Sequence, residues 1–392
     1  MNYRIGLSKK EFVSAIKLVK KVTSKKYPIL SNICLENDDK DNIMLIGTDL
    51  NNTIVVKLKK AYSKDDSVLF RFVFNPADML RIIKDYDDDI TIEDFGDNDT
   101  IAISSSTTSR YVGEYASGNN YPIAPTYVES SSCIEMKVCT FKDITAKLVN
   151  GRECDVVYIS PKNDLASIYY GTESTRMIMV KNNIWSGYKG VLGIPGKMFK
   201  TMSKALTCND ELVTISYMND ATVAIRSGNC YYFSVIPTSK FDLVDGVDDI
   251  VISIEADKGD IIEGINHLLP LMVHRRDRVD ELDLIIRKVK QGEFENTEML
   301  MSMDHGKNNM NFFTIHENIN IIKDNMLELT VGGEYDIHQL HNILKAVSGD
   351  TVLVEVLSNE NVGNILRIVS IIRGVSQQYL LVPFNRRIQY VL

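Results

Sequence analysis

The sequence predicts an α+β protein built from three similar modules, each with two helices and several antiparallel strands. Three observations support this fold class. A basic helical pattern followed by a β-hairpin occupies the first 50 residues, and the same order of elements returns twice. Two later helical patterns align with each other, Pro76 on Pro195, and the same series of strands follows each. The 392 residues give three copies of about 131 residues, a domain-sized period.

The first module is predicted to begin with a helix over residues 8–22, where Ser8 and Glu11 have the spacing of a capping box. Apolar runs over residues 29–35 and 43–46 flank a polar turn and predict the two strands of a hairpin. The hairpin closes on Gly-Thr-Asp-Leu, which we expect to end a strand and to carry no chemistry.

The second helix of each module is predicted over residues 74–86, 194–206 and 335–347. A shorter helix with Thr140 as its cap is expected at the start of the second module. Residues 117–132 are rich in Ser, Asn, Pro and Gly and predict a linker. The expected domains are residues 1–127, 128–246 and 247–392.

Most of the predicted helices carry cations on the face opposite their apolar face. Phosphates are uniform along DNA, so long cations on rigid helices can contact them without reading bases. A single such face is typical of a solvated helix, but its recurrence favours a role in DNA binding. The candidate DNA-binding residues are Lys10, Lys17, Lys21, Arg81, Lys84, Lys142, Lys147, Lys197, Lys200, Lys204, His338, His341 and Lys345.

The overall composition excludes few functions. The formal net charge of −8 argues against a surface that is basic everywhere, but it is compatible with one basic face inside an acidic shell. The six cysteines form no Cys-x-x-Cys pair, so reduced thiols are expected. No apolar run approaches the length of a membrane span, and the amino terminus lacks the apolar core of a signal peptide. We expect a cytoplasmic protein with no membrane contact.

An enzyme is not indicated by any motif. No P-loop, G-x-S-x-G, H-E-x-x-H or G-x-G-x-x-G stands between a predicted strand and helix, and no cofactor is expected. His338 and His341 have a helical spacing that suits two metal ligands. The matching positions of the second module, Lys197 and Lys200, are not ligands of divalent ions at neutral pH. A β-rich, metal-dependent hydrolase using these histidines is therefore the less favoured alternative.

The segments YPILSNICLE and YLLVPF, the GTDL end of the hairpin and the threefold module together resemble the bacterial DNA polymerase III β subunit, the β sliding clamp. The resemblance implies three domains per subunit, with helices inside and sheets outside, and a head-to-tail homodimer that closes a ring around double-stranded DNA. It also implies a processivity factor without catalysis, whose partners are the replicative DNA polymerase and the clamp loader. A monomeric regulator or decoy that binds clamp-seeking motifs is an alternative with the same fold.

The resemblance further implies a hydrophobic cleft between the second and third domains, where short motifs of partner proteins dock. Residues 171–177 match the family's ATDGHRL-like segment, and residues 381–384 match its VMPM-like segment. Leu381 and Val382 have an alternative role as plain strand core. The implied cleft residues are Thr172, Arg176, Met177, Leu381, Val382, Pro383 and Phe384.

Two departures from the family pattern indicate a divergent clamp. The FPDY-like segment reads Phe241 to Val244 here and lacks proline, and the chain continues beyond the terminal motif as Asn385 to Leu392. The family also implies a ring interface formed by the outer edge of the first domain and the region of Leu271 and Met272.

Overall fold

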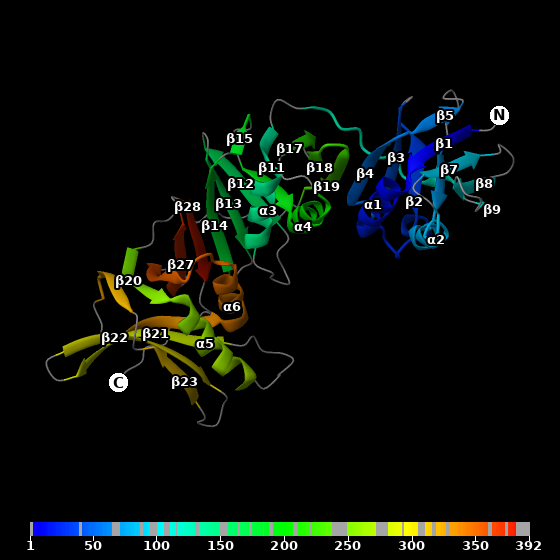
Figure 1. Ribbon diagram of the computed structural model, residues 1–392. Helices are drawn as coiled ribbons and strands as arrows, with labels where there is room; N and C mark the ends of the chain where they lie inside the picture. Colours follow the sequence, from blue (N-terminus) through cyan, green and yellow to red (C-terminus); the bar gives the residue numbers. More distant parts are fainter. Residues whose placement is uncertain are drawn as a thin grey trace. The chain divides into compact units, whose positions relative to one another are not determined.

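The computed structural model describes residues 3–38, 41–64, 71–86, 89–94, 100–105, 110–114, 116–129, 133–148, 156–162, 165–171, 175–182, 184–187, 191–206, 211–219, 222–236, 249–271, 281–291, 294–304, 310–315, 319–326, 330–359, 363–372 and 375–381. The chain divides into two compact units, and Figure 1 labels their helices and strands. One unit holds residues 1–141, 186–188 and 197–236, and the other holds residues 142–185, 189–196 and 237–392.

The described elements of the first copy of the module lie before residue 121. The symbol η denotes a 3-10 helix. Its elements are β1 (Tyr3–Ser8), α1 (Lys9–Val19), η1 (Lys20–Val22), η2 (Pro28–Ser31), β2 (Ile33–Asn37), β3 (Asn42–Thr48), β4 (Asn52–Lys59), β5 (Tyr62–Lys64), β6 (Arg71–Phe74), α2 (Pro76–Ile82), β7 (Asp89–Asp94), β8 (Thr100–Ser105), β9 (Arg110–Glu114), β10 (Ala116–Ser117) and η3 (Gly118–Asn120).

The second and third copies repeat this order. The second copy contains β11 (Cys133–Lys137), α3 (Val138–Lys147), β12 (Val156–Lys162), β13 (Leu165–Gly171), β14 (Thr175–Asn182), β15 (Ile184–Ser186), β16 (Leu192–Pro195), α4 (Gly196–Ala205), β17 (Leu212–Asn219), β18 (Thr222–Ser227) and β19 (Cys230–Val235). The third copy contains β20 (Asp249–Asp257), α5 (Lys258–Leu268), η4 (Leu269–Leu271), β21 (Glu281–Gln291), β22 (Phe294–Asp304), β23 (Met310–Ile315), β24 (Asn320–Asp324), β25 (Thr330–Asp336), α6 (Ile337–Ala346), β26 (Thr351–Asn359), β27 (Gly363–Ile372) and β28 (Val375–Leu381).

Each copy contributes two sheet segments whose strand orders correspond. The first segments run β1-β7-β8-β9, β11-β17-β18-β19 and β20-β26-β27-β28. The second segments run β6-β2-β3-β4, β16-β12-β13-β14 and β25-β21-β22-β23. All the recorded pairings are antiparallel, and α1, α3 and α5 follow equivalent strands. The prediction of an α+β fold with three similar modules, each with two helices and antiparallel sheets, is confirmed.

Consecutive copies are joined strand to strand. In the first unit β4 pairs with β19, so that Asn52 lies opposite Ser234 and Val56 opposite Cys230. In the second unit β14 pairs with β28 in the same way, from Thr175 opposite Leu381 to Met179 opposite Gln377. The domain boundaries after residues 127 and 246 stay predictions, because the two contact units divide the second copy between them.

The cores form where the helices bury their apolar faces. In α1 the buried side chains are Phe12, Ala15, Ile16 and Val19, and in α6 they are Ile337, Leu340, Ile343 and Leu344. Their spacing of three and four residues is that of one helical face. Phe141 of α3 stacks on Phe199 of α4, with ring centroids 4.4 Å apart. In the described ranges, no helix is long and apolar enough to cross a membrane.

Two local expectations are wrong, and a third, Ser8 as the N-cap residue of α1, is met in position without the capping hydrogen bond. Residues 28–31 form the 3-10 helix η2 where a strand was expected, because Pro28 fixes a helical φ at its first position and Leu30 N–H bonds back to the Tyr27 carbonyl. Ser8 precedes α1, but its side chain makes no capping hydrogen bond. Thr140 lies inside α3, which begins at Val138.

Candidate nucleic-acid interface

The first basic face belongs to α1 and η1. Lys10, Lys17 and Lys21 are exposed, while Phe12 and Ile16 on the opposite side are fully buried. Burial of the apolar face fixes the orientation of the helix, and the cations are therefore held outward on a rigid support. The sequence predicted this face, and the structure places its three lysines as expected.

The second basic face lies on α4, in the same unit. Its buried side includes Met198 and Met202, and Lys197 and Lys204 are exposed. Lys197 Nζ lies 3.8 Å from Asp49 Oδ2 in the turn between β3 and β4, so part of its charge is offset. Lys200, between them, is half-buried.

The faces of α1 and α4 are close enough to interact electrostatically. Burial lowers the pKa of Lys21, and the positive charge of Lys204 lowers it further. Two like charges held near each other favour an anionic ligand, because the ligand's charge relieves their repulsion. The proximity of Lys21 and Lys204 thus joins the first helix of copy one and the second helix of copy two into one electropositive strip.

The cations on and beside α2 and α3 are more often paired or half-buried than those of α1. Arg81 is 81% exposed and pairs with Asp78 one turn earlier, at 3.1 Å. Lys84 is exposed just after the end of α2, and its carbonyl accepts a hydrogen bond from Lys9 Nζ at 2.9 Å. Lys142 of α3 is half-buried. Lys147 ends α3, and its side chain lies outside the described residues.

The second helix of copy three carries the histidines. His338 and Lys345 are exposed on α6, whereas His341 is half-buried and its Nε2 has no hydrogen-bond partner among the described residues. Burial lowers the pKa of His341, and the charges of Lys345 and His338 lower it further. His341 is therefore neutral near pH 7. Within the described ranges, no three His, Cys, Asp or Glu side chains gather in a way that could hold a metal ion.

Three exposed lysines were missed by the sequence argument. Lys20, Lys25 and Lys26 lie beside the α1 face, on η1 and in the segment that leads to η2. They fall off the 100° periodicity of the helix, so the stripe pattern did not select them. The run of basic residues that continues after the helix could have predicted them.

The GTDL turn has a polar role that the sequence did not indicate. Asp49 Oδ1 accepts hydrogen bonds from the backbone N–H groups of Asn51 and Asn52, at 3.0 and 2.7 Å. Asn52 Oδ1 in turn accepts from Ser234 Oγ of β19, at 2.9 Å. This turn therefore connects copy one with copy two, and through Asp49 it also meets Lys197.

Three of the residues implied for the partner cleft lie on β14 and β28 of the second unit. Pairing of β14 with β28 places Arg176 opposite Leu380 and Met177 opposite Tyr379. Leu381 ends β28 and is buried, as its alternative role in the core requires. The side chains of Arg176, Met177 and Leu271 are not described, and Thr172, Val382, Pro383, Phe384, Met272, the segment Phe241 to Val244 and the tail Asn385 to Leu392 lie outside the described residues.

The N-terminal third of the chain is similar in sequence to a known family. Residues 1–125 match the family model of the DNA polymerase III beta subunit, N-terminal domain. A search of the curated proteins found no match.

Solved structures match the whole length of the chain. The DNA polymerase sliding clamp of Bacillus subtilis is 16% identical with a TM-score of 0.77, over 99% of this chain and 100% of that one. This chain has the sliding-clamp fold. The DNA polymerase III beta subunit of Thermotoga maritima (13% identity, TM-score 0.76, 98% and 100% covered) and the clamp of Pseudomonas aeruginosa (12%, 0.77, 97% and 99%) share this clamp fold. The resemblance drawn from the sequence is confirmed.

Proposed function

We propose that the protein is a DNA sliding clamp, a processivity factor without catalytic activity. Two copies would close a ring around duplex DNA without sequence preference and tether a DNA polymerase and other replication proteins. The observation that carries this proposal is the electropositive strip formed by α1 and α4, on a chain with the sliding-clamp fold along its entire length.

Ring closure is supported by the strand pairings. Each junction inside the chain joins the last strand of one copy's second segment to the last strand of the next copy's first segment, β4 to β19 and β14 to β28. The equivalent strands left over are β23 and β9, and each ends its sheet in the described part of the chain. A strand edge with unpaired N–H and C=O groups is a template for another chain. Pairing β23 of one protomer with β9 of another would repeat the internal junction and close a head-to-tail dimer.

Contact with DNA would be loose and electrostatic. The exposed lysines of α1 and α4 can meet phosphates at many equivalent positions, and no side chain needs to enter a groove. Such binding weakens steeply with salt, whereas a closed ring holds DNA by topology. The combination allows the protein to slide while it stays on the duplex.

Partner proteins would dock beside the junction of β14 and β28. The pairing brings the segment of Arg176 and Met177 next to Leu381, so three of the implied cleft residues lie on two adjacent strands. Short apolar motifs would bind there, and polymerase and clamp loader would compete for the site. Substitution of Met177 by Asp should abolish capture of such motifs and leave DNA retention unchanged.

Retention on DNA of different topology tests the function. The protein is loaded on a nicked circular plasmid with a clamp loader and then washed at raised salt. A clamp remains on the circle and leaves after a single restriction cut, because the open ends let the ring slide off. Equal loss from circular and linear DNA would contradict the topological mechanism. A species that stays monomeric at micromolar concentration in sedimentation would instead favour the monomeric regulator.

A further inference from the structure

A basic segment over residues 20–27 follows α1. Its exposed cations are Lys20, Lys21, Lys25 and Lys26. No Asp or Glu occurs in residues 12–35, although the whole chain carries a formal net charge of −8. Such a local concentration of positive charge attracts the phosphates of a nucleic acid.

An exposed aromatic ring ends this segment. Tyr27 is 50% exposed, and Lys26 Nζ lies 6.0 Å from the centroid of its ring. Leu30, three residues later, is only 2% exposed and anchors η2 in the core. The anchoring of this segment thus falls to Leu30, and the Tyr27 ring is available at the surface beside the cation of Lys26.

Backbone hydrogen bonds hold the ring and the neighbouring cations in place. The N–H of Ser24 donates to the Leu30 carbonyl at 2.9 Å, and the N–H of Leu30 donates to the Tyr27 carbonyl at 3.0 Å. The N–H of Lys26 donates to Ser24 Oγ at 3.2 Å. Pro28 fixes its own φ directly after the ring. The loop is therefore organised before any ligand binds, which lowers the entropic cost of binding.

Cations combined with an exposed aromatic ring are typical of sites for single-stranded nucleic acid. In a duplex the faces of the bases are stacked on one another, so that only the phosphates and the base edges can be contacted. In a single strand the face of an unpaired base can stack on a tyrosine, and every base offers such a face. Lysines alone would serve for a duplex, whereas the Tyr27 ring suits an unpaired base.

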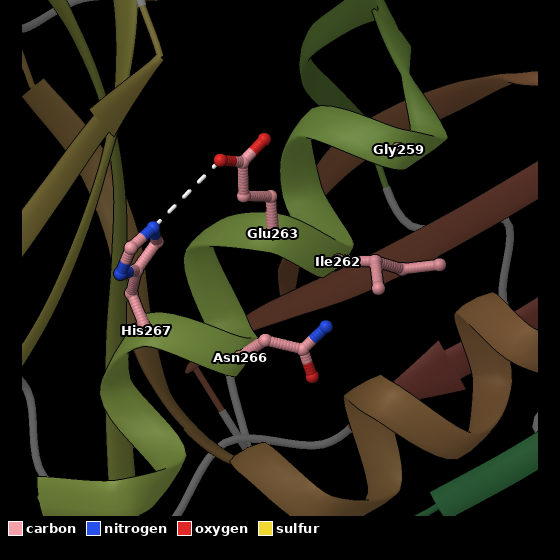
Figure 2. Close-up of a pocket in the computed structure, with 5 residues that line it drawn as sticks. All are labelled: Gly259, Ile262, Glu263, Asn266 and His267. Carbon is pink, nitrogen blue, oxygen red and sulfur yellow. Dashed lines mark ion pairs between the residues drawn. The ribbon is translucent and has the colours of Figure 1, made fainter.

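The third copy does not repeat the basic pattern. Helices α1 and α5 both begin directly after the first strand of their copy, so their positions correspond by counting. Lys17 and Lys21 correspond to Asn266 and Pro270. Figure 2 shows Asn266 with Glu263 among the residues that line an open hollow on α5. The combination of cations and an aromatic ring is thus a property of the first copy and not of the module.

We propose that residues 24–27 bind single-stranded DNA, with an unpaired base stacked on the Tyr27 ring and the flanking phosphates on Lys25 and Lys26. The site needs neither a second copy nor a closed ring, and it goes beyond the proposed function. The exposed contact of Lys26 with the ring is weak enough to be exchanged for a phosphate. Where a duplex ends in a single strand, the strip of α1 and α4 would hold the duplex and Tyr27 would meet an unpaired base.

Removal of the ring from the protein and of the bases from the ligand tests this site. Fluorescence anisotropy at low salt measures the affinity of the full-length protein for an oligothymidylate of about eight nucleotides. The same strand with abasic sites and a short duplex are measured in parallel. Tyr27→Ala should weaken binding of the oligothymidylate about tenfold and change the other two affinities less than about twofold, because only the first ligand can stack. Lys25→Ala should weaken all three, since all carry phosphates.

Two control variants involve the only tryptophan of the chain, Trp185. This residue is 56% exposed on β15, and Trp185→Ala, which removes a similarly exposed ring, should change none of the three affinities. Tyr27→Trp should keep the affinity for the oligothymidylate. In a Trp185→Phe background, the fluorescence of Tyr27→Trp should be quenched by the oligothymidylate and not by the abasic strand.

Several outcomes would overturn the single-strand site. These are an unchanged affinity of Tyr27→Ala for the oligothymidylate, an equal loss for the abasic strand, or tighter Tyr27-dependent binding to polyglutamate or to phosphatidylserine vesicles. Retention on nicked circular DNA tests the clamp function separately, and Tyr27→Ala should still be retained there. Loss of the wild type from such circles would contradict the clamp and leave the site at Tyr27 standing.

Discussion

At the scale of single residues, the decisive feature is the approach of Lys21 to Lys204. Their exposure could be predicted from periodicity, because each lies opposite buried apolar side chains. Their proximity could not, since it depends on how β4 pairs with β19 across a separation of some 180 residues in the sequence. The same pairing explains why Lys197 meets Asp49.

Removal of either lysine should weaken DNA binding. We expect Lys21→Ala and Lys204→Ala each to reduce the slope of log affinity against log salt by about 0.9, the value for one phosphate contact. The double variant should lose less binding free energy for DNA than the two single variants lose together. The reason is that the repulsion between Lys21 and Lys204, which DNA relieves in the wild type, is already absent in each single variant. Fluorescence anisotropy with a short duplex at several salt concentrations measures this, with Lys323→Ala on β24 as the control. Strict additivity would contradict the interaction.

Asp49 should contribute to stability through the turn that it organises. Leu50 in this turn has φ 78°, a conformation that side-chain-bearing residues adopt at a cost, and the Asp49 carboxylate holds the following N–H groups. Asp49→Ala should lower the free energy of unfolding by about 1–2 kcal/mol. Asp49→Asn keeps the accepting oxygen and should cost less than about 0.5 kcal/mol. Chemical denaturation compares the two; equal losses would point to the Lys197 pair instead.

At the scale of elements, helices were more predictable than the segments that precede them. The amphipathic patterns of α1, α4 and α6 follow directly from burial at spacings of three and four residues. The apolar run over residues 29–35 was ambiguous, because short apolar stretches suit a strand or a helical turn. The hydrogen bond from Leu30 N–H to the Tyr27 carbonyl, with Pro28 at the first helical position, favours the 3-10 helix η2 over a strand. The stripe on α6 also differs from the expectation, since His341 is half-buried and Lys345 is exposed.

The state of His341 should make α6 sensitive to acid. Its pKa in the folded protein is lowered from 6.5, so below that pH the unfolded chain binds the proton more readily. The neutral His341 imidazole therefore contributes to the free energy of unfolding above pH 6.5. This contribution is lost as the pH falls through the lowered pKa of the folded protein. We expect the unfolding free energy of the wild type to decrease more between pH 7 and pH 5 than that of His341→Gln. Urea titrations at both pH values measure this, and parallel decreases would contradict it.

The same lowered pKa bears on DNA binding by α6. Because the pKa of His341 is lowered, this imidazole resists protonation and should add little positive charge to α6 on mild acidification. His341→Gln should therefore leave the change in DNA affinity between pH 7 and pH 6 unaltered, measured by the same anisotropy titration. A clearly smaller change in this variant would contradict this.

At the scale of the whole molecule, the threefold repeat could be predicted from the sequence. The strand pairs that join consecutive copies, β4 with β19 and β14 with β28, could not. Strand order and helix order recur at a period that alignment of Pro76 with Pro195 already suggested. Which strand of one copy pairs with which strand of the next depends on long-range register, for which a single sequence carries no periodic signal. The cleft and interface residues were placed by resemblance alone, and their burial and contacts could not be derived.

The outer strand of the first copy should govern dimer formation. Tyr111 of β9 is 41% exposed, and β9 ends its sheet among the described strands. A lysine placed there would keep the monomer folded but would introduce a charge into the new strand pair, a common device against edge association. Tyr111→Lys should shift sedimentation from dimer to monomer, while Leu212→Lys at a comparably exposed site on β17 should not. An unchanged dimer would exclude β9 from the interface.

The outer edges of β9 and β23, which have no strand partner in the described part of the chain, also allow ring closure to be measured by hydrogen exchange. In a free chain, we expect the outward backbone N–H groups of these strands to exchange hydrogen for deuterium rapidly. In β4 and β19 the corresponding groups are already bonded within the chain. Peptides from β9 and β23 should therefore become protected only as protein concentration rises, whereas those from β4 and β19 should be protected at every concentration. Deuterium uptake in β9 and β23 would therefore report whether the ring is open or closed.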